Sequence, residues 1–414
     1  MINLETPRKF ETLVSQAHQV AVSVFRPNSR KYDTAEHEYP KELDMLAALL
    51  DGMTESGGMG GAGVGTVGGG ADANGAGDGT GAGSGNRNGS NMASLLGLIE
   101  LCWGDVGLML SMPRQGLGQA AIAALATPDQ LERFGGKWAA MAITEPEAGS
   151  DSAAIRTTAA IDPAHPDEYV LNGSKIFVTS GERAELVVVW ATLDRSQGRA
   201  AIKSFVVERT NPGFKLERLE HKLGIRASDT ANFVLQDCRV PKENLLGSSE
   251  IESRKGFAGA MQTFDNTRPM VAGMAIGVAR ACLEATREHL RTAGVEIDYD
   301  RPPASQTAAA AEFISMEAEW EAARLLTLQA AWMADNRKPN SLQASMAKAK
   351  AGRVGTEIAL RCVALCGAAG FGEGELLEKW ARDAKILDLF EGTQQIQLLI
   401  IARQLLDRTS AELK

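Results

Sequence analysis

The segment from Met141 to Asp151 places hydroxyl groups, carboxylates and a glycine directly after an apolar run. Thr144, Ser150 and the free backbone amides of such a turn can donate hydrogen bonds to the edge of a flavin ring or to a pyrophosphate. Because Gly149 has no Cβ, it permits unusual backbone dihedrals and a close approach of a ligand. An ordinary exit from a strand into a loop would have the same composition, so this segment alone leaves both interpretations open.

A second candidate is Glu391, which stands beside a glycine in the tetrapeptide Phe390-Glu391-Gly392-Thr393. Taken alone, a glutamate next to a glycine at a helix break is usually a solvated cap. A carboxylate that is held in place and partly removed from water can instead act as a general base, because desolvation raises its pKa. The motifs elsewhere in the chain decide between these two interpretations.

Five further motifs lie at ordered intervals between these two segments and around the second. In chain order they are Lys175–Gly181, Lys222–Thr230, Arg239–Gly247, Phe264–Pro269 and Arg382–Gln397. Together with the first segment they closely resemble the acyl-CoA dehydrogenase family. The resemblance covers residues 140–406, and the number and order of the motifs make chance agreement negligible.

The resemblance implies a multidomain α+β fold with an N-terminal α-helical domain, a middle β-barrel-like domain and a C-terminal four-helix bundle. It implies an oxidoreductase of CH–CH bonds in fatty acid β-oxidation, with an acyl-CoA substrate and an electron-transferring flavoprotein as acceptor. FAD would lie between the last two domains and extend toward a neighbouring subunit. By family position the cofactor contacts would be Ile143, Thr144, Gly149, Ser150, Phe177, Thr179, Thr393 and Gln395. The substrate contacts would be Ser150, Ser228, Asp265, Arg268 and Gly392.

The same resemblance makes Glu391 the catalytic base. The α-hydrogen of a thioester is a weak acid, so the base must be positioned and partly desolvated. In the family, the amide of the base residue and a ribityl hydroxyl of FAD stabilise the thioester oxygen as charge develops on it. The β-hydride then passes to flavin N5, and the cofactor carries the redox chemistry.

Two segments depart from the family pattern, and both concern the half of FAD that reaches the neighbouring subunit. The family has Arg, two residues and then Phe-Gly after the first bundle helix, whereas this chain has Arg291–Asp298 without the Phe-Gly pair. The family's Gln before a Gly-Gly-Asn-Gly turn falls on Ala364, and the turn itself is Gly367–Gly370. Compensated drift and a homologous partner subunit that supplies these contacts both remain open.

Composition places the chain among globular proteins, with 414 residues, 44% of them hydrophobic and 23% charged. A net charge of −9 would repel nucleic acid, because the lysines and arginines are spread along the chain. Residues 1–22 contain no apolar run of signal length, and the apolar stretch Ile396–Leu406 is too short to span a bilayer. We therefore expect a cytoplasmic protein that neither inserts into a membrane nor binds nucleic acid.

The five cysteines are odd in number and sit mostly in apolar helical contexts, which indicates reduced thiols in the core. Cys362 and Cys366 could face one way on a helix, but no histidine lies near them to complete a zinc site. We expect no metal centre.

Hydrophobic periodicity independently divides the chain into the same α, β, α order. Apolar spacing predicts helices at 10–24, 42–53 and 92–110, within a helical domain of residues 1–139. Short β-rich runs at 169–171, 176–178, 186–190, 205–207 and 233–235 place a β domain at 140–250, with turns at Asn172-Gly173 and Asn211–Gly213. Long amphipathic helices at 257–290, 306–336, 342–366, 376–389 and 394–406 predict a bundle within 251–414.

The stretch 57–89 is rich in glycine and has almost nothing apolar enough to bury, which predicts a flexible surface loop. Within it, Gly63–Gly68 matches the dinucleotide fingerprint Gly-x-Gly-x-x-Gly. That motif requires a preceding strand and a following helix, and the sequence predicts neither, so we expect no nucleotide site there.

The function predicted from the sequence is FAD-dependent α,β-desaturation of an acyl thioester. The main alternative is a non-catalytic or partly catalytic subunit of a heteromeric acyl-CoA dehydrogenase, and the oligomer is either a homo-oligomer or such a heteromer. Relatives of this fold that bind DNA or oxidise other substrates are disfavoured by the acidic charge and by the motif around Glu391. The sequence leaves open the chain length, branching or sterol origin of the acyl group, and whether its carrier is coenzyme A or an acyl carrier protein.

Overall fold

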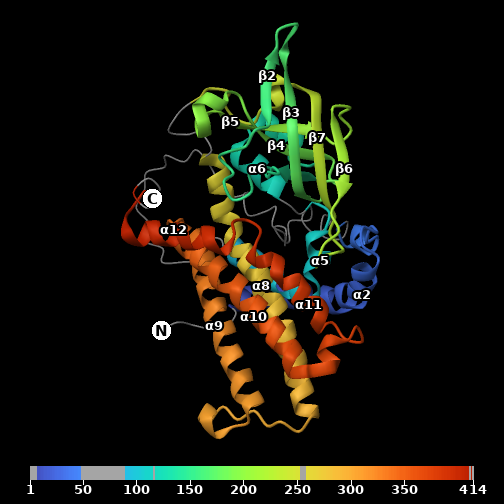
Figure 1. Cartoon of the computed structure of the whole chain (residues 1–414), viewed down its shortest axis with the longest axis vertical. Coiled ribbons are helices and arrows are strands. Elements are labelled where there is room, and N and C mark those ends of the chain that lie inside the picture. The colour runs from blue at the N-terminus through green and yellow to red at the C-terminus, as the bar shows by residue number, and fades with distance from the viewer. Residues whose placement is uncertain (1–6, 48–88, 115–116, 252–257, 410–411, 413–414) are drawn as a thin grey trace.

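A computed structural model describes residues 7–47, 89–114, 117–251, 258–409 and 412, without the side chains of 258–266. The glycine-rich segment 57–88, with Gly63–Gly68 inside it, lies outside the described residues, and so does the predicted helix 42–53 beyond residue 47. Helices precede and follow the strands in chain order, so the α, β, α order predicted from periodicity is confirmed, and Figure 1 shows the curled sheet at one end of the molecule above the long helices.

The N-terminal part consists of short helices that are divided where the sequence favours a break. Asp105 separates α4 from α5, because its side chain accepts a hydrogen bond from Leu108 N and caps the second helix. The elements are α1 (Arg8–Val20), a π-helical turn (Ala21–Phe25), α2 (Arg26–Thr34), α4 (Ser90–Gly104), α5 (Val106–Leu110), α6 (Leu117–Leu125) and α7 (Pro128–Phe134).

The middle part is a seven-stranded sheet in the order β1-β4-β2-β3-β7-β6, and β5 pairs with β4. Most pairs are antiparallel, whereas β4 is parallel to both β1 and β2. The strands are β1 (Ala139–Ala142), β2 (Thr158–Asp162), β3 (His165–Thr179), β4 (Leu186–Thr192), β5 (Ile202–Glu208), β6 (Phe214–Leu219) and β7 (Thr230–Pro241).

The position of β4 in the fold explains why its sequence is continuously apolar, without the alternation of polar and apolar residues. All of its residues are buried, because both faces of the strand are covered. Val187 and Val189 belong to the core inside the curled sheet, whereas Leu186 and Val188 pack with Ile122 of α6 on the opposite face.

The C-terminal part is built on long helices that share one hydrophobic core with the N-terminal helices. Leu95 and Leu98 of α4 join Met274 of α8 and Phe313 of α9 in this core. Gly277 lets α8 lie close to α4, since a Cβ there would fall 2.4 Å from the Ile99 carbonyl oxygen. The elements are α8 (Ala258–Thr292), α9 (Ala308–Asp335), α10 (Ser341–Phe371), α11 (Leu377–Ala384), a 3-10 turn (Lys385–Asp388) and α12 (Gln394–Leu406).

A buried ionic cluster ties the three parts of the chain together. Lys379 of α11 forms ion pairs with Asp105, the N-cap of α5, and with Asp383, 2.7 Å away. Asp383 also accepts a hydrogen bond of 2.5 Å from Ile225 N, in the connection between β6 and β7. Because breaking a buried ion pair leaves an uncompensated charge, this cluster fixes how the sheet sits on the bundle.

One predicted turn was wrong. Asn172 and Gly173 do not end a strand; β3 continues through them with a bulge, where the pairing to β7 shifts between Leu171 and Gly173. Gly173 has φ +156°, and a Cβ there would lie 2.4 Å from Thr157 Oγ1. A glycine inside a strand pattern marks a bulge or a close backbone approach as readily as a turn.

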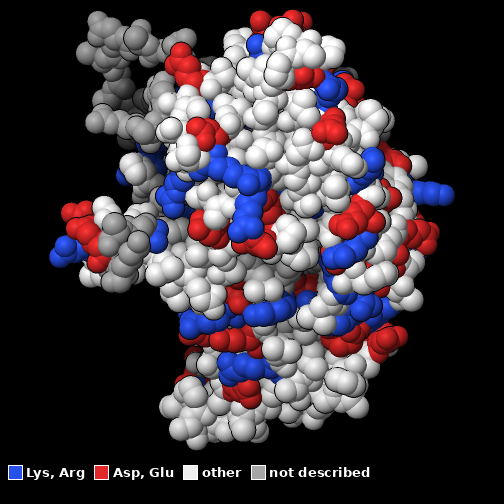
Figure 2. Space-filling model, turned by 45° about the horizontal axis from the view of Figure 1, so that its top comes forward, with Lys and Arg blue, Asp and Glu red and all other residues white. Residues whose placement is uncertain are grey.

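Helix α10, among the described residues, is long and apolar enough to cross a membrane by length and composition alone. It packs against α8, α9 and α12, and it carries the buried polar residues Ser345 and Lys348. We interpret it as the central helix of the bundle. Figure 2 shows one face of the molecule, on which lysine and arginine are interspersed with aspartate and glutamate.

Candidate active site

Glu391 lies in a sharp turn between the 3-10 turn and α12, and the turn is strained. Glu391 has φ +54° and Gly392 has φ +92°, so both residues occupy the region that favours glycine. A Cβ on Gly392 would lie 2.4 Å from Gln397 Nε2. Thr393 begins α12 as its N-cap, with its hydroxyl accepting a hydrogen bond from Ile396 N. Figure 1 places α12 at the end of the bundle nearest the sheet.

Two buried side chains hold this turn by its backbone carbonyl oxygens. Lys348 Nζ of α10 donates to the Gly392 oxygen at 2.7 Å. Gln397 Nε2 donates to the oxygens of Glu391 and Gly392 at 3.1 and 3.2 Å. Strained backbone persists only where its surroundings over-determine it, and these bonds supply that constraint.

The carboxylate of Glu391 is the electrostatically unusual group of the site. The residue as a whole is half-buried, yet its Oε2 is inaccessible to water and has no hydrogen-bond partner. Burial raises the pKa of Glu391, while a hydrogen bond with Thr267 and the charges of Lys348 and Arg268 partly offset the rise. A carboxyl group with a raised pKa and an unused buried oxygen is suited to accept a proton from a bound molecule.

The pKa of Lys348 is also shifted by the buried position of its side chain. Only 1% of its surface is exposed, and burial lowers its pKa to about 8, against the opposing attraction of Asp388 and Glu391. Arg268 and Lys385 lower the pKa further by repulsion. Neither Lys348 nor Gln397 is singled out by the sequence, since Lys348 is one of five charged residues in 342–366 and Gln397 is only the last residue of the Arg382–Gln397 motif.

On the sheet, the predicted cofactor residues gather around a second bulge in β3. The pairing of β3 with β7 shifts between Lys175 and Val178, and Phe177 in the bulge has φ +58° and 59% of its surface exposed. Phe177 N donates to Asn232 Oδ1 at 3.2 Å, which fixes the bulge. Thr179, at the end of the strand, is half-buried. Bulges occur often beside active sites because they re-aim a side chain.

A buried ion pair joins β3 to the segment that follows β1. Lys175 Nζ donates to Glu145 Oε1 at 2.7 Å and to the Ile143 oxygen at 3.1 Å, while Thr144 O accepts from Ile176 N at 2.9 Å. Burial lowers the pKa of Lys175 to about 8, and Glu145 opposes that shift. Although burial acts to raise it, the pKa of Glu145 is lowered, chiefly by Lys175. The pair thereby fixes the backbone at Ile143 and Thr144.

The next residues of this segment are exposed and unobstructed. Gly149 and Ser150 are exposed, and a Cβ on Gly149 would meet nothing within 4 Å. Gly149 does not use the unusual dihedrals that a glycine permits, because its φ is not in the left-handed region. The open space above it, rather than its conformation, is what suits a ligand.

The remaining predicted residues differ in their burial and in their distance from the site. Ser228 is fully buried and its hydroxyl lies 3.5 Å from the Asp229 oxygen, which favours a role in supporting its loop over direct contact with a substrate. Arg268 is buried beside Glu391, whereas Gln395 is exposed on the first turn of α12. Asp265 lies in α8, but its side chain is outside the described residues.

The residues present fit a flavin. An exposed aromatic ring on a fixed bulge offers a surface for a planar ring to pack on, and the half-buried hydroxyls of Thr144 and Thr179 offer donors beside it. The unpartnered buried oxygen of Glu391 then supplies the acid–base group that a redox site on carbon requires.

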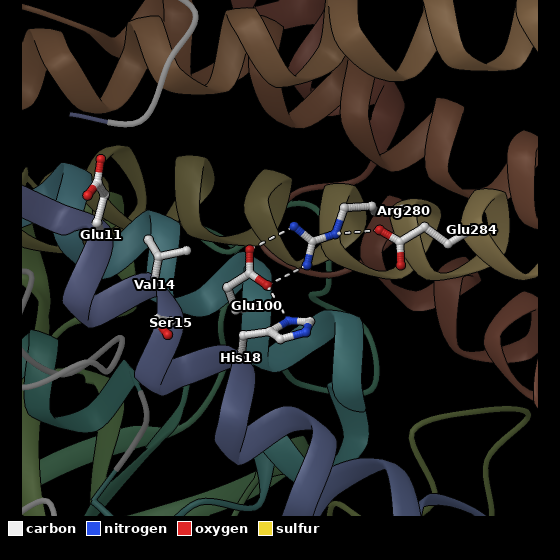
Figure 3. Close-up of a pocket in the computed structure, with 7 residues that line it drawn as sticks. All are labelled: Glu11, Val14, Ser15, His18, Glu100, Arg280 and Glu284. Atoms are coloured by element: carbon white, nitrogen blue, oxygen red, sulfur yellow. Dashed lines mark hydrogen bonds and ion pairs between the residues drawn. The ribbon is translucent and has the colours of Figure 1, made fainter. Parts of the chain in front are cut away.

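A hollow of about 360 Å³ lies elsewhere, between α1, α4 and α8. As Figure 3 shows, Arg280 and His18 converge on the Glu100 carboxylate, and Arg280 also reaches Glu284. These charges satisfy one another. Arg280 stands 12 residues beyond Arg268 on α8, or about 18 Å along the helix. We therefore separate this hollow from the site around Glu391.

Comparison with known proteins covers the sheet and the bundle. Residues 140–238 match the family model described as "Acyl-CoA dehydrogenase, middle domain", and residues 254–406 match "Acyl-CoA dehydrogenase, C-terminal domain". The solved structure of butyryl-CoA dehydrogenase from Megasphaera elsdenii has a TM-score of 0.79 at 28% sequence identity, over 98% of this chain and 100% of that chain. The predicted fold class is thus confirmed.

Two curated proteins show the extent of the similarity along the sequence. Mitochondrial short-chain specific acyl-CoA dehydrogenase from Mus musculus is 39% identical over 272 residues, which cover 66% of this chain and 64% of that protein. The match thus spans less than two thirds of that relative. Caffeyl-CoA reductase-Etf complex subunit CarC from Acetobacterium woodii is 34% identical over 311 residues, which cover 74% of this chain and 79% of that protein. With both domain models matched and relatives at this identity, the chain belongs to the acyl-CoA dehydrogenase family.

Proposed function

We propose that the protein catalyses the α,β-dehydrogenation of an acyl thioester with Glu391 as the base that takes the α-proton. One observation carries the proposal. The strained turn presents a carboxylate whose Oε2 is buried, without a hydrogen-bond partner, and whose pKa burial raises. A solvated helix cap would have none of these properties.

The chain's own residues would divide the work between binding and proton transfer. Lys348 and Gln397 hold the turn, so Glu391 meets a bound thioester in a fixed orientation, and correct orientation lowers the barrier without any change in the base itself. Thr267, Lys348 and Arg268 keep enough of the carboxylate ionised for it to accept a proton. The amide of Glu391 would stabilise the developing negative charge on the thioester oxygen.

FAD is the cofactor that the site would hold, and when bound it accepts the hydride from the β-carbon. Phe177 would pack on its ring, and Thr144, Thr179 and the backbone at Ile143 would bond to its edge. The Lys175–Glu145 pair would keep these groups in place without contacting the cofactor.

We propose a short-chain acyl-CoA as the substrate class, and the names of the mouse and Megasphaera relatives support this choice. CarC is called a reductase, so the direction of the reaction in the cell is a separate question from its chemistry. The decisive test is anaerobic bleaching of the purified flavoprotein by acyl-CoAs of increasing length. Bleaching by no acyl-CoA, from a preparation that holds one flavin per chain, would contradict the proposal.

We propose an electron-transferring flavoprotein as the electron acceptor, since CarC is named as a subunit of a reductase–Etf complex. The expected result is saturable reduction of that flavoprotein in the presence of substrate. The cytoplasm is the compartment we propose for the reaction.

A partly catalytic subunit of a heteromer is the second candidate function, and it is favoured by the two departures from the family pattern, at the end of α8 and on an exposed face of α10. Ala364 is exposed there, and Leu360 and Phe371 expose 57% and 78% of their surfaces. Arg291, at the other departure from the family pattern, is exposed and pairs only locally, with Glu288. An apolar face beside both departures suits a partner chain that completes the cofactor site.

The flavin content of the purified chain separates the two assemblies. A heteromer predicts weak or substoichiometric FAD for the chain alone and tight binding once a homologous partner is co-expressed. Restoring Ala364→Gln by itself should help only modestly, because one hydrogen bond to a charged group contributes about 1.5–3 kcal/mol. A homo-oligomer with one tightly held FAD per chain and full turnover would refute the heteromer.

A further inference from the structure

Two histidines and a glutamate converge on the side of the molecule where α2 meets the connection between β6 and β7. Glu36 and His37 follow α2, and His221 follows β6. One ligand atom from each of the three lies within 4.8 Å of the other two. The site around Glu391 uses none of them, so they call for a separate explanation.

The distances within this cluster suit a tetrahedral ion. Bonds of about 2.0–2.1 Å at tetrahedral angles place neighbouring ligand atoms about 3.3 Å apart and two imidazole centroids about 5 Å apart. Glu36 Oε2 lies 2.9 Å from His221 Nδ1, and the rings of His37 and His221 are 4.9 Å apart and tilted by 56°. Both observed distances are slightly shorter than the ion would require, by a few tenths of an ångström at most, so small side-chain movements would admit it.

A purely structural role for the cluster does not explain the environment of the His37 ring. Both of its ring nitrogens are inaccessible to water and have no hydrogen-bond partner. Its backbone has φ +72°, an uncommon conformation for a residue other than glycine. An unsatisfied buried polar group is costly, and an ion bound to one of these nitrogens would remove that cost.

Glu36 is already oriented as a ligand. The Lys222 backbone N–H donates to Oε1 at 2.8 Å, which leaves Oε2 facing His221. Such outer contacts hold a coordinating carboxylate in place. The Lys222 ammonium donates to the Ser228 oxygen at 2.7 Å, although its charge also acts on Glu36 and His37. Glu182 adds a second negative charge near His37.

We propose that Glu36, His37 and His221 bind one divalent first-row transition-metal ion, with Zn²⁺ as the best match and water in the open position. Two imidazoles and a carboxylate are ligands of the type that zinc, nickel and cobalt accept, whereas calcium and magnesium prefer oxygen alone. The ion would join the end of α2 to the connection that carries Ile225, which Asp383 holds from the bundle side. Its role is to fasten the N-terminal helices to the sheet.

The test uses the full-length flavoprotein without a histidine tag, stripped with chelator and titrated with Zn²⁺ by calorimetry and equilibrium dialysis. His221→Ala is the principal variant, because that side chain is 83% exposed and its loss should not disturb folding. His37→Ala is the second. His165→Ala is the matched control, since His165 also pairs with a carboxylate, Asp162 at 3.0 Å, in an exposed position but without a third ligand.

We expect one Zn²⁺ per chain, at least on the order of tenfold weaker binding in His37→Ala and His221→Ala, and unchanged binding in His165→Ala. Zn²⁺ should raise the unfolding temperature of the wild type and not that of His221→Ala. Co²⁺ should give the intense visible absorption of four-coordinate cobalt in the wild type only. Binding that survives both substitutions within threefold, or that falls equally in His165→Ala, would overturn the assignment, as would no saturable binding at all.

Discussion

Replacing Lys348 by methionine should change the rate of flavin reduction more than the free energy of unfolding. The Lys348 ammonium holds the turn at Glu391 and Gly392, here called the base turn, but it is costly to bury. Its pKa of about 8, against an ordinary value of 10.5, means that the fold pays roughly 3 kcal/mol to keep the buried group charged. Methionine removes that penalty and one hydrogen bond to Gly392, whose oxygen still accepts from Gln397 at 3.2 Å. We expect the free energy of unfolding at neutral pH to fall by no more than about 1 kcal/mol.

The same substitution should impair proton abstraction in two measurable ways. Without the bond to Gly392 the turn loses one of its two restraints, and a base displaced by a fraction of an ångström slows flavin reduction by about 10- to 100-fold. Without the neighbouring cation, the pKa of Glu391 rises further. Because only the ionised carboxylate accepts a proton, the acidic limb of the rate profile should move to higher pH.

The assay is anaerobic stopped-flow reduction of the flavin by butyryl-CoA across the pH range, with urea unfolding of the same samples. Lys350→Met is the control, since Lys350 lies on the same helix but pairs with Glu319 on its outer side. The wild type should also gain stability as pH rises from about 8 toward 10.5, because the unfolded state binds more protons there, and Lys348→Met should lose part of that gain.

The reasoning about Lys348 fails if the variant reduces flavin within threefold of the wild type with an unmoved acidic limb. It fails equally if the limb moves to lower pH, since that would mean that the ammonium raises the pKa of Glu391. A loss of several kcal/mol in stability, together with lost flavin, would assign Lys348 a structural role and nothing more.

Three further substitutions probe the two sides of the site. Glu391→Gln should retain flavin while reduction falls about 10²- to 10⁴-fold, and a variant that keeps a tenth of the rate in stopped flow would contradict its role as base. Gly392→Ala should lose about 1–3 kcal/mol in urea unfolding, because φ +92° and the 2.4 Å approach to Gln397 both penalise a Cβ; an unchanged unfolding midpoint would count against the strained turn. Lys175→Met should lose about 3–5 kcal/mol by leaving Glu145 charged and unpaired, and should also weaken FAD binding; undiminished stability would show that the pair is dispensable.

The order of elements was predictable because periodicity and turn chemistry are local properties. The helices predicted at 257–290, 306–336 and 394–406 coincide with α8, α9 and α12 within a few residues. The ends of the strands were harder to predict from the sequence. Asn172-Gly173 has the composition of a turn, and only the pairing of β3 with β7 on both sides of it makes it a bulge. That pairing joins residues far apart in the chain, so no local pattern records it.

The candidate site divides in the same way. The resemblance to the family made Thr144, Phe177 and Glu391 candidates, because each falls on a family position within a motif of the sequence. The lysines that hold the backbone of the site could not be identified from the motifs. Lys348 and Lys175 stand in apolar segments, where a lysine side chain usually extends to solvent. Their significance lies in what they reach, a carbonyl oxygen of the base turn and a carboxylate beneath the flavin-facing segment, and both are tertiary contacts.

The two buried lysines also suggest how the site keeps its geometry without a bound ligand. Each lies on a regular element, α10 or β3, and each donates to the backbone of an irregular segment next to it. Charged donors form stronger hydrogen bonds than neutral ones, and their burial excludes the water that would compete for the same carbonyl oxygens. The irregular segments carry Glu391 and Thr144, so the two buried ammonium groups fix the backbone of the proposed base on one side and of a proposed flavin contact on the other. At position 348 a hydrophobic residue would cost little stability and leave a looser turn, whereas at position 175 it would leave Glu145 charged and unpaired, so stability alone accounts for Lys175 but not for Lys348.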